Sequence, residues 1–324
     1  MGSVPLARVI RSGLEESVHR GDVAVADVSG SVVFAAGDPD RPVFARSSMK
    51  PLQAAVSLSL MEIDPPEAEV SVMCASHNAE PIHVATVRSL LARCGVPESA
   101  LRCPEYRPWD EETAIQFPHR ARINSDCSGK HAGMLGACEA QGWPLETYRD
   151  PEHPLQRTVL DRVTEVGGQE PATVGVDGCG VPVHGLPLAT MAALYARLGA
   201  PARFDAFGTF VERAVGAMRA EPYLVAGRNR VDTALMEVTP NLLVKSGAEA
   251  LICASILDRG LGVAVKVRDG TSRAAGPAMI HALAALGVVD PERLDPLHPF
   301  ARPAVLGGGV PVGEIVAGFE LLPV

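Results

Sequence analysis

Strand-like segments lie at both ends of this chain, and helical patterns fill its middle. Before residue 47, DVAVADVSGSVVFAAG (22–37) consists of two apolar runs joined by Ser29-Gly30, which predicts a β-hairpin. After residue 240, NLLVKSG, EALICASI and LGVAVKVRDG are again strand-like, with a turn at 258–260. Apolar residues recur at helical spacing most clearly at 83–93, 130–140, 154–166, 187–198 and 204–219.

This order of segments predicts an α+β fold. Its sheet is built from both chain ends, residues 1–46 and 241–324, and residues 47–240 form a mainly helical region. We expect residues 1–324 to form a single domain. The glycine cluster LGGGVPVG (306–313) lacks the strand–GxGxxG–helix context of a dinucleotide site, and we predict a loop there.

The composition excludes several classes of protein. A net charge of −9 argues against a surface for nucleic acid or anionic membranes, and no apolar run is long enough to span a bilayer. The first residues, MGSVPLARVIRSG, lack the apolar segment of a secretory signal. Seven cysteines are an odd number without the density of a disulfide scaffold. We therefore expect a cytoplasmic protein with reduced thiols.

Lysine is scarce in this chain. Of the 29 basic residues only four are lysine, and the other 25 are arginine. A lysine can give up its proton near neutral pH when it is buried, whereas an arginine effectively cannot. The four lysines therefore mark positions to inspect for chemistry; they are Lys50, Lys130, Lys245 and Lys266.

The stretch RSSMKPLQA (46–54) permits two interpretations. Ser47 and Lys50 are three residues apart, so on a helix they share one face and can act as nucleophile and base. Serine is also a common helix cap, and proline is tolerated in a first turn, so the same residues are typical of a plain helix start. Ser48 is only two residues from Lys50, which puts that pair on different faces.

Two later motifs favour the catalytic interpretation. Ser-x-x-Lys, then Ser-x-Asn at 76–78, then Lys-Ser-Gly at 245–247 follow the order found in serine β-lactamases and penicillin-binding proteins. The middle motif reads SHN rather than SDN, and the last reads KSG rather than KTG.

Four longer blocks are similar to another group. ARSSMKPLQA, MCASHNAE, NSDCSGKHAGML and VDGCGVP, in this order, resemble the asparaginase II family, typified by the inducible rhizobial L-asparaginase. The resemblance implies a serine β-lactamase-like fold with an antiparallel sheet, hydrolysis of L-asparagine to L-aspartate and ammonia, and a homodimer. It also implies two Ser–Lys tandems, Ser47 with Lys50 and Ser76 with Lys245.

The family further implies a zinc site. Its two cysteines and one lysine correspond to Cys127, Lys130 and Cys179. Taken without the family, these cysteines read as buried structural residues, because zinc sites ordinarily use histidine or four thiolates. A lysine must be neutral to bind a metal, so we expect zinc binding to depend strongly on pH.

The expected mechanism divides amide hydrolysis into acylation and deacylation. Ser47 attacks the side-chain carbonyl of asparagine with Lys50 as base, while Ser76 and Lys245 relay a proton to the departing ammonia. The reverse assignment, with Ser76 as nucleophile, remains open.

Asparagine also carries an ammonium and a carboxylate that need partners. The candidates are Asp177 for the ammonium and Arg46 for the carboxylate. His131, next to Lys130, is a candidate for a supporting position, and Glu80 for orienting His77 or Ser76.

Two other functions compete with asparagine hydrolysis. The chain could be another β-lactamase-fold serine hydrolase, acting on β-lactams, esters or peptides, or a non-catalytic relative that binds zinc or a ligand. The lack of an export signal argues against cell-wall substrates.

Overall fold

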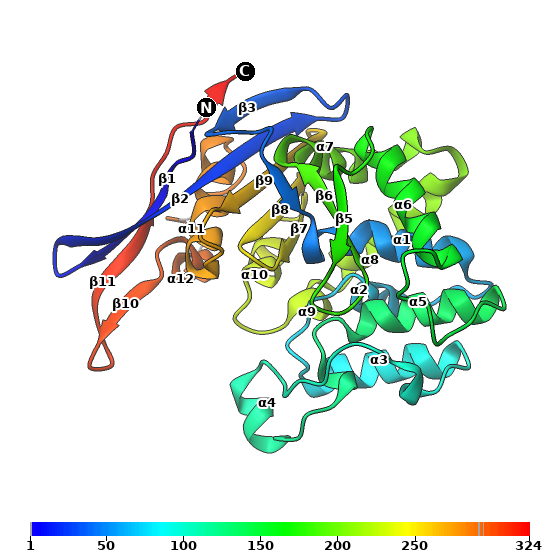
Figure 1. Ribbon diagram of the computed structural model, residues 1–324. Coiled ribbons are helices and arrows are strands. Elements are labelled where there is room, and N and C mark those ends of the chain that lie inside the picture. Colours follow the sequence, from blue (N-terminus) through cyan, green and yellow to red (C-terminus); the bar gives the residue numbers. More distant parts are fainter. Residues whose placement is uncertain (1, 291, 294) are drawn as a thin grey trace. The chain divides into compact units, whose positions relative to one another are not determined.

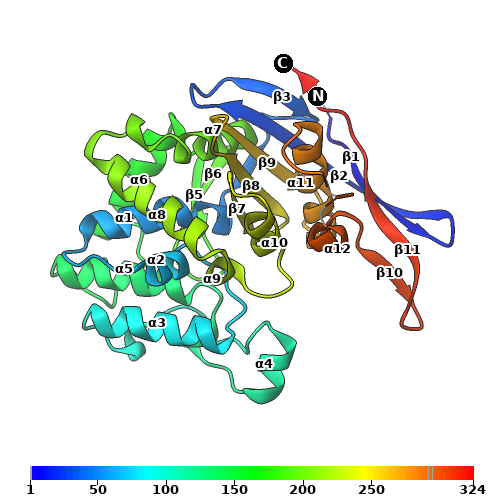
Figure 2. The ribbon, with the colours of Figure 1, turned by 180° about the vertical axis from the view of Figure 1, so that it is seen from behind.

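The computed structural model describes residues 2–290, 292–293 and 295–324 (Figures 1 and 2). The chain divides into two compact units. Unit 1 contains Met1–Ser48, Gly185–Ala200 and Ala234–Val324, and unit 2 contains Met49–His184 and Pro201–Thr233. The prediction of one domain stays a prediction.

Unit 1 is built on an antiparallel sheet with the order β10-β11-β1-β2-β9-β8-β7, and β3 pairs with both β2 and β12. The N-terminal strands β1 and β2 therefore lie between strands from the C-terminal part, as β2 pairs with β9 and β1 with β11. This confirms the predicted sheet built from both ends. The strands are β1 (Val4–Arg11), β2 (Leu14–Asp27), β3 (Val32–Ala36), β7 (Leu242–Gly247), β8 (Leu251–Ile256), β9 (Leu261–Val267), β10 (Ala304–Gly307), β11 (Val310–Ala317) and β12 (Leu322–Pro323).

Two helices cover this sheet. Helix α7 (Leu188–Leu198) packs against β2, β8 and β9, and α11 (Ala275–Ala285) packs against β8, β9 and β11. The strands read as continuous apolar runs because several are buried throughout; all six residues of β8 are buried. The short helix α12 (His298–Ala301) packs against α11.

Turn chemistry explains both hairpins. The predicted turn between β2 and β3 is confirmed, and the Asp27 carboxylate accepts hydrogen bonds from the backbone N–H groups of Ser29, Gly30 and Ser31. The predicted loop at LGGGVPVG is wrong, because β10 and β11 run through it. Only Gly308 and Gly309, at φ +57° and +83°, form the turn, so the glycines serve a tight hairpin.

Unit 2 is mainly helical, as predicted. Helix α1 packs against α5 and α8, α2 against α5 and α8, and α3 against α5. The predicted helical segments are confirmed with small shifts at their ends. The helices are α1 (Lys50–Leu60), α2 (Glu67–Met73), α3 (Pro81–Arg93), α4 (Glu111–Gln116), α5 (Ser128–Ala140), α6 (Pro154–Gly167), α8 (Gly208–Ala220) and α9 (Pro222–Ala226).

Three elements continue from one unit into the other along the chain: the 3₁₀ turn η1 (Arg46–Met49), β6 (Pro182–Pro187) and α10 (Val231–Val238). In unit 1, β6 pairs with β4 (Pro42–Phe44). In unit 2, β5 (Thr173–Val176) precedes a turn in which the N–H of Asp177 donates to the carbonyl of Val181. Within the described ranges, no helix combines the length and apolar character needed to cross a membrane.

Two glycines provide a matched test of packing. A Cβ at Gly262 in β9 would lie 2.0 Å from the carbonyl oxygen of Ala192 in α7, and backbone cannot move aside cheaply. A Cβ at Gly216, exposed in α8, would meet no atom within 4 Å. We expect Gly262→Ala to lower the free energy of unfolding by at least about 3 kcal/mol. Gly216→Ala should raise it by about 0.5–1 kcal/mol.

Urea titration followed by circular dichroism measures both changes. Equal effects of the two substitutions would contradict the close contact between β9 and α7.

Candidate active site

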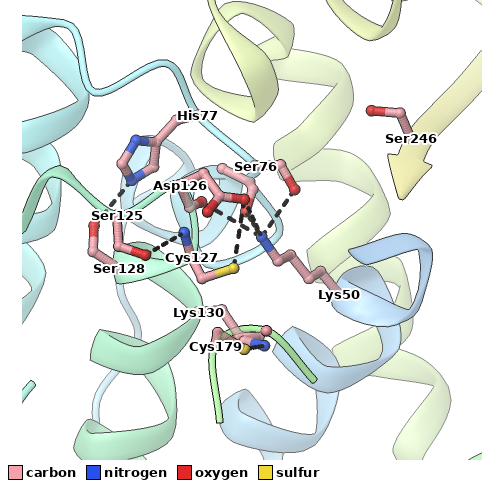
Figure 3. A network of polar contacts seen from close by, with 12 residues as sticks. Lys50, Ser76, His77, Ser125, Asp126, Cys127, Ser128, Lys130, Cys179 and Ser246 are labelled. Atoms are coloured by element: carbon pink, nitrogen blue, oxygen red, sulfur yellow. Dashed lines mark hydrogen bonds and ion pairs between the residues drawn. The ribbon is translucent and has the colours of Figure 1, made fainter. Parts of the chain in front are cut away.

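Lys50 is the first residue of α1 and has no exposed surface. Its Nζ donates to the carbonyl oxygen of Ala75 at 2.6 Å, to Ser76 Oγ at 2.9 Å and to the carbonyl oxygen of Asp126 at 3.4 Å (Figure 3). The Asp126 carboxylate lies 3.8 Å away. Pro51 in the first turn needs no N–H partner, so the helix can begin at this buried position. Lys50 and Ser76 therefore share a direct hydrogen bond.

The backbone around Ser76 is held on both sides. The N–H of Ser76 donates to the carbonyl of Val225 at 2.9 Å, and the N–H of Asn78 donates to the carbonyl of Ala226 at 3.0 Å. Between them, the N–H of His77 donates to the carbonyl of Asp126 at 3.2 Å. Ser76 is 4% exposed, so its hydroxyl is held in place in a largely buried setting.

The His77 ring has one tautomer consistent with its contacts. Nδ1 accepts from the N–H of Ala79 at 3.1 Å, so Nε2 carries the proton and donates to Ser128 Oγ at 3.0 Å. Ser128 Oγ in turn donates to the carbonyl of Ile123 at 2.9 Å. Burial, and then nearby His83, Lys50 and Arg230, lower the pKa of His77 well below its ordinary value. A neutral His77 fits this chain of hydrogen bonds.

Glu80 supports Asn78 rather than His77 or Ser76. Its carboxylate accepts from the backbone N–H of Arg228 at 3.0 Å, from Tyr223 Oη at 2.5 Å and from Asn78 Nδ2 at 3.5 Å. A Cβ at Gly227, whose φ is +104°, would lie 2.3 Å from the same carboxylate. Glycine is therefore required where the chain passes this network.

Arg230 was not identified by the sequence analysis. Its Nη1 donates to the carbonyl of Ser76 at 3.1 Å and to Asn78 Oδ1 at 2.9 Å, and its guanidinium lies 5.7 Å from the ring centre of Trp109. Arg230 is 154 residues from Ser76, and no sequence pattern pointed to this proximity.

The predicted zinc ligands are brought together. Cys127 is the N-cap residue of α5, Lys130 follows one turn later, and Cys179 comes from the turn after β5. Lys130 Nζ lies 3.0 Å from Cys179 Sγ (Figure 3), and Asp177 Oδ2 lies 3.5 Å from the same sulfur. All three predicted ligands are buried.

The pKa values of the two thiols in this cluster are shifted in opposite directions. A hydrogen bond from Cys127, together with the Lys130 ammonium, lowers the pKa of Cys179 well below its ordinary value despite burial. That same hydrogen bond and burial raise the pKa of Cys127. Burial alone would lower the pKa of Lys130, but Cys179, Cys127 and Asp177 outweigh it and raise that pKa. These shifts favour the anionic form of Cys179 and the protonated forms of Cys127 and Lys130.

The donor set fits a metal ion if lysine takes part. Among the described residues no group of three or more His, Cys, Asp or Glu side chains is placed to hold a metal. A metal here would need the two sulfurs and the Lys130 amine; Lys130 Nζ contacts Cys179 Sγ, and Cys127 is hydrogen-bonded to Cys179. His131, which follows Lys130 in the sequence, is fully buried, and its Nδ1 lies 2.5 Å from Tyr148 Oη.

The remaining predicted residues lie in unit 1. Arg46 and Ser47 form part of η1, and Arg46 has φ +46°. Lys245 on β7 has no exposed surface, and its Nζ donates to the carbonyl of Ser246 at 2.7 Å. Ser48 Oγ donates to the carbonyl of Lys245 at 3.1 Å, so Ser48 has a structural contact that its spacing did not predict.

Buried histidines make the stability of the protein sensitive to acid. Burial lowers the pKa of His184 in β6 from 6.5 to about 4. Between these values the unfolded chain binds more protons than the folded one, so stability is lost as pH falls from about 6.5 towards 4. At pH 5 this loss amounts to about 2 kcal/mol for His184.

We expect His184→Gln to reduce the fall in unfolding free energy between pH 7.5 and pH 5 by about that amount. The exposed His298, replaced in His298→Gln, is the control and should leave the fall unchanged. Urea titrations at both pH values measure it. An identical fall in His184→Gln and the wild type would show that His184 titrates normally.

A profile of the protein family described as L-asparaginase II matches residues 7–317 of the chain. No curated protein matches it. Solved structures similar to the chain include a β-lactamase from Mycobacterium bovis, with 17% identity, a TM-score of 0.45, and coverage of 83% of this chain and 95% of that one. A glutaminase from Bacillus is similar with 13% identity, a TM-score of 0.37 and coverage of 83% and 91%. These structural likenesses are too distant to support a statement about activity.

Proposed function

The chain belongs to the L-asparaginase II family, and we propose that it hydrolyses the side-chain amide of L-asparagine to L-aspartate and ammonia. The observation that supports this most is the hydrogen bond between buried Lys50 Nζ and Ser76 Oγ at 2.9 Å. A serine hydroxyl becomes a nucleophile only when a neighbouring base takes its proton, and Lys50 in its amine form is such a base.

The reaction then proceeds in two balanced steps. Lys50 accepts the hydroxyl proton as Ser76 Oγ forms a bond to the amide carbon of asparagine. The carbon–nitrogen bond breaks, and the nitrogen leaves as ammonia with the proton returned by Lys50. Water then gives a proton to Lys50 and attacks the resulting ester; Lys50 returns that proton to Ser76 as aspartate leaves.

Ser47 remains the alternative nucleophile. The resemblance to the family pairs Ser47 with Lys50 and Ser76 with Lys245, and in that assignment Ser76 and Lys245 relay the proton to ammonia. Both assignments use Lys50 as the base; they differ in which serine carries the ester and in which groups return the proton to ammonia.

We expect Lys50→Met and Ser76→Ala to lower kcat for ammonia release at least about 1,000-fold, since one removes the base and the other the proposed nucleophile. Ser47→Ala, which removes the alternative nucleophile, should retain measurable turnover. Acid quenching during turnover, followed by peptide mass spectrometry, locates the aspartyl ester on Ser76 in the proposed mechanism.

An ester on Ser47 would establish the alternative. No ammonia from asparagine with the wild type would exclude the proposed function. Turnover of the β-lactam nitrocefin by that protein would then indicate another serine hydrolase, and a stable metal or ligand complex without turnover would indicate a non-catalytic relative.

We further propose that Cys127, Lys130 and Cys179 bind zinc. When bound, zinc supplies a Lewis acid that polarises oxygen ligands. Because cysteine and lysine bind zinc in their deprotonated forms, and the pKa values of Cys127 and Lys130 are raised, binding should release protons at neutral pH and strengthen as pH rises.

Calorimetry in buffers of different ionisation enthalpy measures the released protons, and elemental analysis measures the zinc content. Lys130→Arg keeps the positive charge but offers no lone pair, so it should abolish stoichiometric zinc. Cys138→Ala, in α5 outside the cluster, is the control and should retain it. Full zinc content in Lys130→Arg would remove lysine from the ligand set.

The resemblance also carries the proposals of a homodimer and of a cytoplasmic location. Light scattering on the full chain measures the oligomeric state.

A further inference from the structure

Arg230, beside Ser76, is a cation whose contacts among the described residues are all neutral groups. Its contacts in the part of the chain that the structure describes are the carbonyl of Ser76, the amide oxygen of Asn78 and the ring of Trp109, all of them neutral. No carboxylate takes part in its hydrogen bonds or ion pairs there. The guanidinium is half-buried, so its charge is only partly compensated by water.

The other basic side chains in this part of unit 2 lie against acidic or sulfur-containing side chains. Arg228 pairs with Asp110 at 3.2 Å and with Glu80 at 3.5 Å, and it also contacts Glu112. Lys50 lies 3.8 Å from the Asp126 carboxylate. Lys130 Nζ contacts Cys179 Sγ at 3.0 Å. Arg230 is thus the cation of this group that is best able to accept an additional anion.

We propose that Arg230 binds the α-carboxylate of the amino-acid substrate. This inference rests on the proposed function. In extended asparagine the carboxylate carbon lies about 4 Å from the side-chain amide carbon, as three carbon–carbon bonds require. Arg230 Nη1 lies 3.1 Å from the carbonyl oxygen of Ser76, so the guanidinium contacts the residue that carries the proposed nucleophile.

The contacts of Arg230 hold its guanidinium in a fixed orientation. Nη1 is tied to Ser76 and Asn78, and Asn78 is itself held because its Nδ2 donates to the carbonyl of Arg228 at 2.9 Å. The backbone N–H of Trp109 donates to the carbonyl of Asn78 at 2.9 Å. This bond holds the backbone of Trp109, whose ring lies beside the guanidinium. A guanidinium fixed through one nitrogen keeps Nε and Nη2 for the paired hydrogen bonds that carboxylates accept.

The test compares asparagine with 3-aminopropanamide, the same molecule without its α-carboxylate. The wild type should prefer asparagine in kcat/KM by at least about 100-fold, because a half-buried cation without an anionic partner penalises the analogue. Arg230→Gln keeps a donor for Ser76 and Asn78 but removes the charge. It should lose most of the preference through kcat/KM for asparagine, with turnover of 3-aminopropanamide within about 3-fold of the wild type.

Two matched variants define the specificity of this effect. Arg157→Ala removes an exposed guanidinium that pairs with Glu152 outside this network and should leave the preference unchanged. Arg46→Ala tests the arginine that the sequence analysis assigned to the carboxylate. Loss of the preference in Arg46→Ala with its retention in Arg230→Gln would overturn the proposal. An equal fall in the turnover of both substrates in Arg230→Gln would make Arg230 a structural clamp and also overturn it.

A second measurement needs no variant. L-Aspartate should protect Arg230 of the wild-type protein from modification by phenylglyoxal, as located by peptide mass spectrometry, whereas 3-aminopropanoate should not. Modification of Arg230 at the same rate with and without L-aspartate would overturn the proposal. Failure of the proposed function is separate, because it would appear as absence of ammonia release from asparagine by the wild type.

Discussion

A lysine side chain without exposed surface is held between three segments of unit 2. Its Nζ contacts the backbone of Ala75 and Asp126 and the hydroxyl of Ser76, so the start of α1, the segment after α2 and the turn before α5 meet at one nitrogen. A buried amine that lost these partners would be strongly destabilising, whether charged or neutral. The same contacts that make burial of Lys50 tolerable also place it against the candidate nucleophile.

The segment from Ser76 to Glu80 shows how such a site is kept rigid. Its backbone pairs with Val225, Ala226 and Asp126, and its side chains are fixed from outside the segment. His77 is held through Ser128, and Asn78 through Arg230 and Glu80. Burial that keeps His77 neutral makes this support depend on pH, since a protonated ring could not accept from the N–H of Ala79. Stability and site geometry are thus coupled through the same hydrogen bonds.

Much of the fold could be predicted from local patterns. Periodicity identified α3, α5, α6 and α8 of unit 2, α7 of unit 1 and the strands at both ends, because one buried face or a wholly buried run leaves a direct mark on the sequence. It failed at LGGGVPVG, where glycines suggested a loop although they serve a two-residue hairpin turn between strands. Lysine scarcity directed attention to Lys50, Lys130 and Lys245, all of which are buried.

The sequence by itself determined the element types, the Ser–Lys spacing at the start of α1 and the Cys–Lys spacing at the start of α5, because these depend on residues within one or two helical turns. Only the tertiary structure decided that Ser76 contacts Lys50, that Cys179 joins Cys127 and Lys130, and that Arg230 lies beside Ser76. These contacts join positions 26 to 154 residues apart. They follow from how the helices pack and how buried polar groups find partners, and no local pattern encodes either.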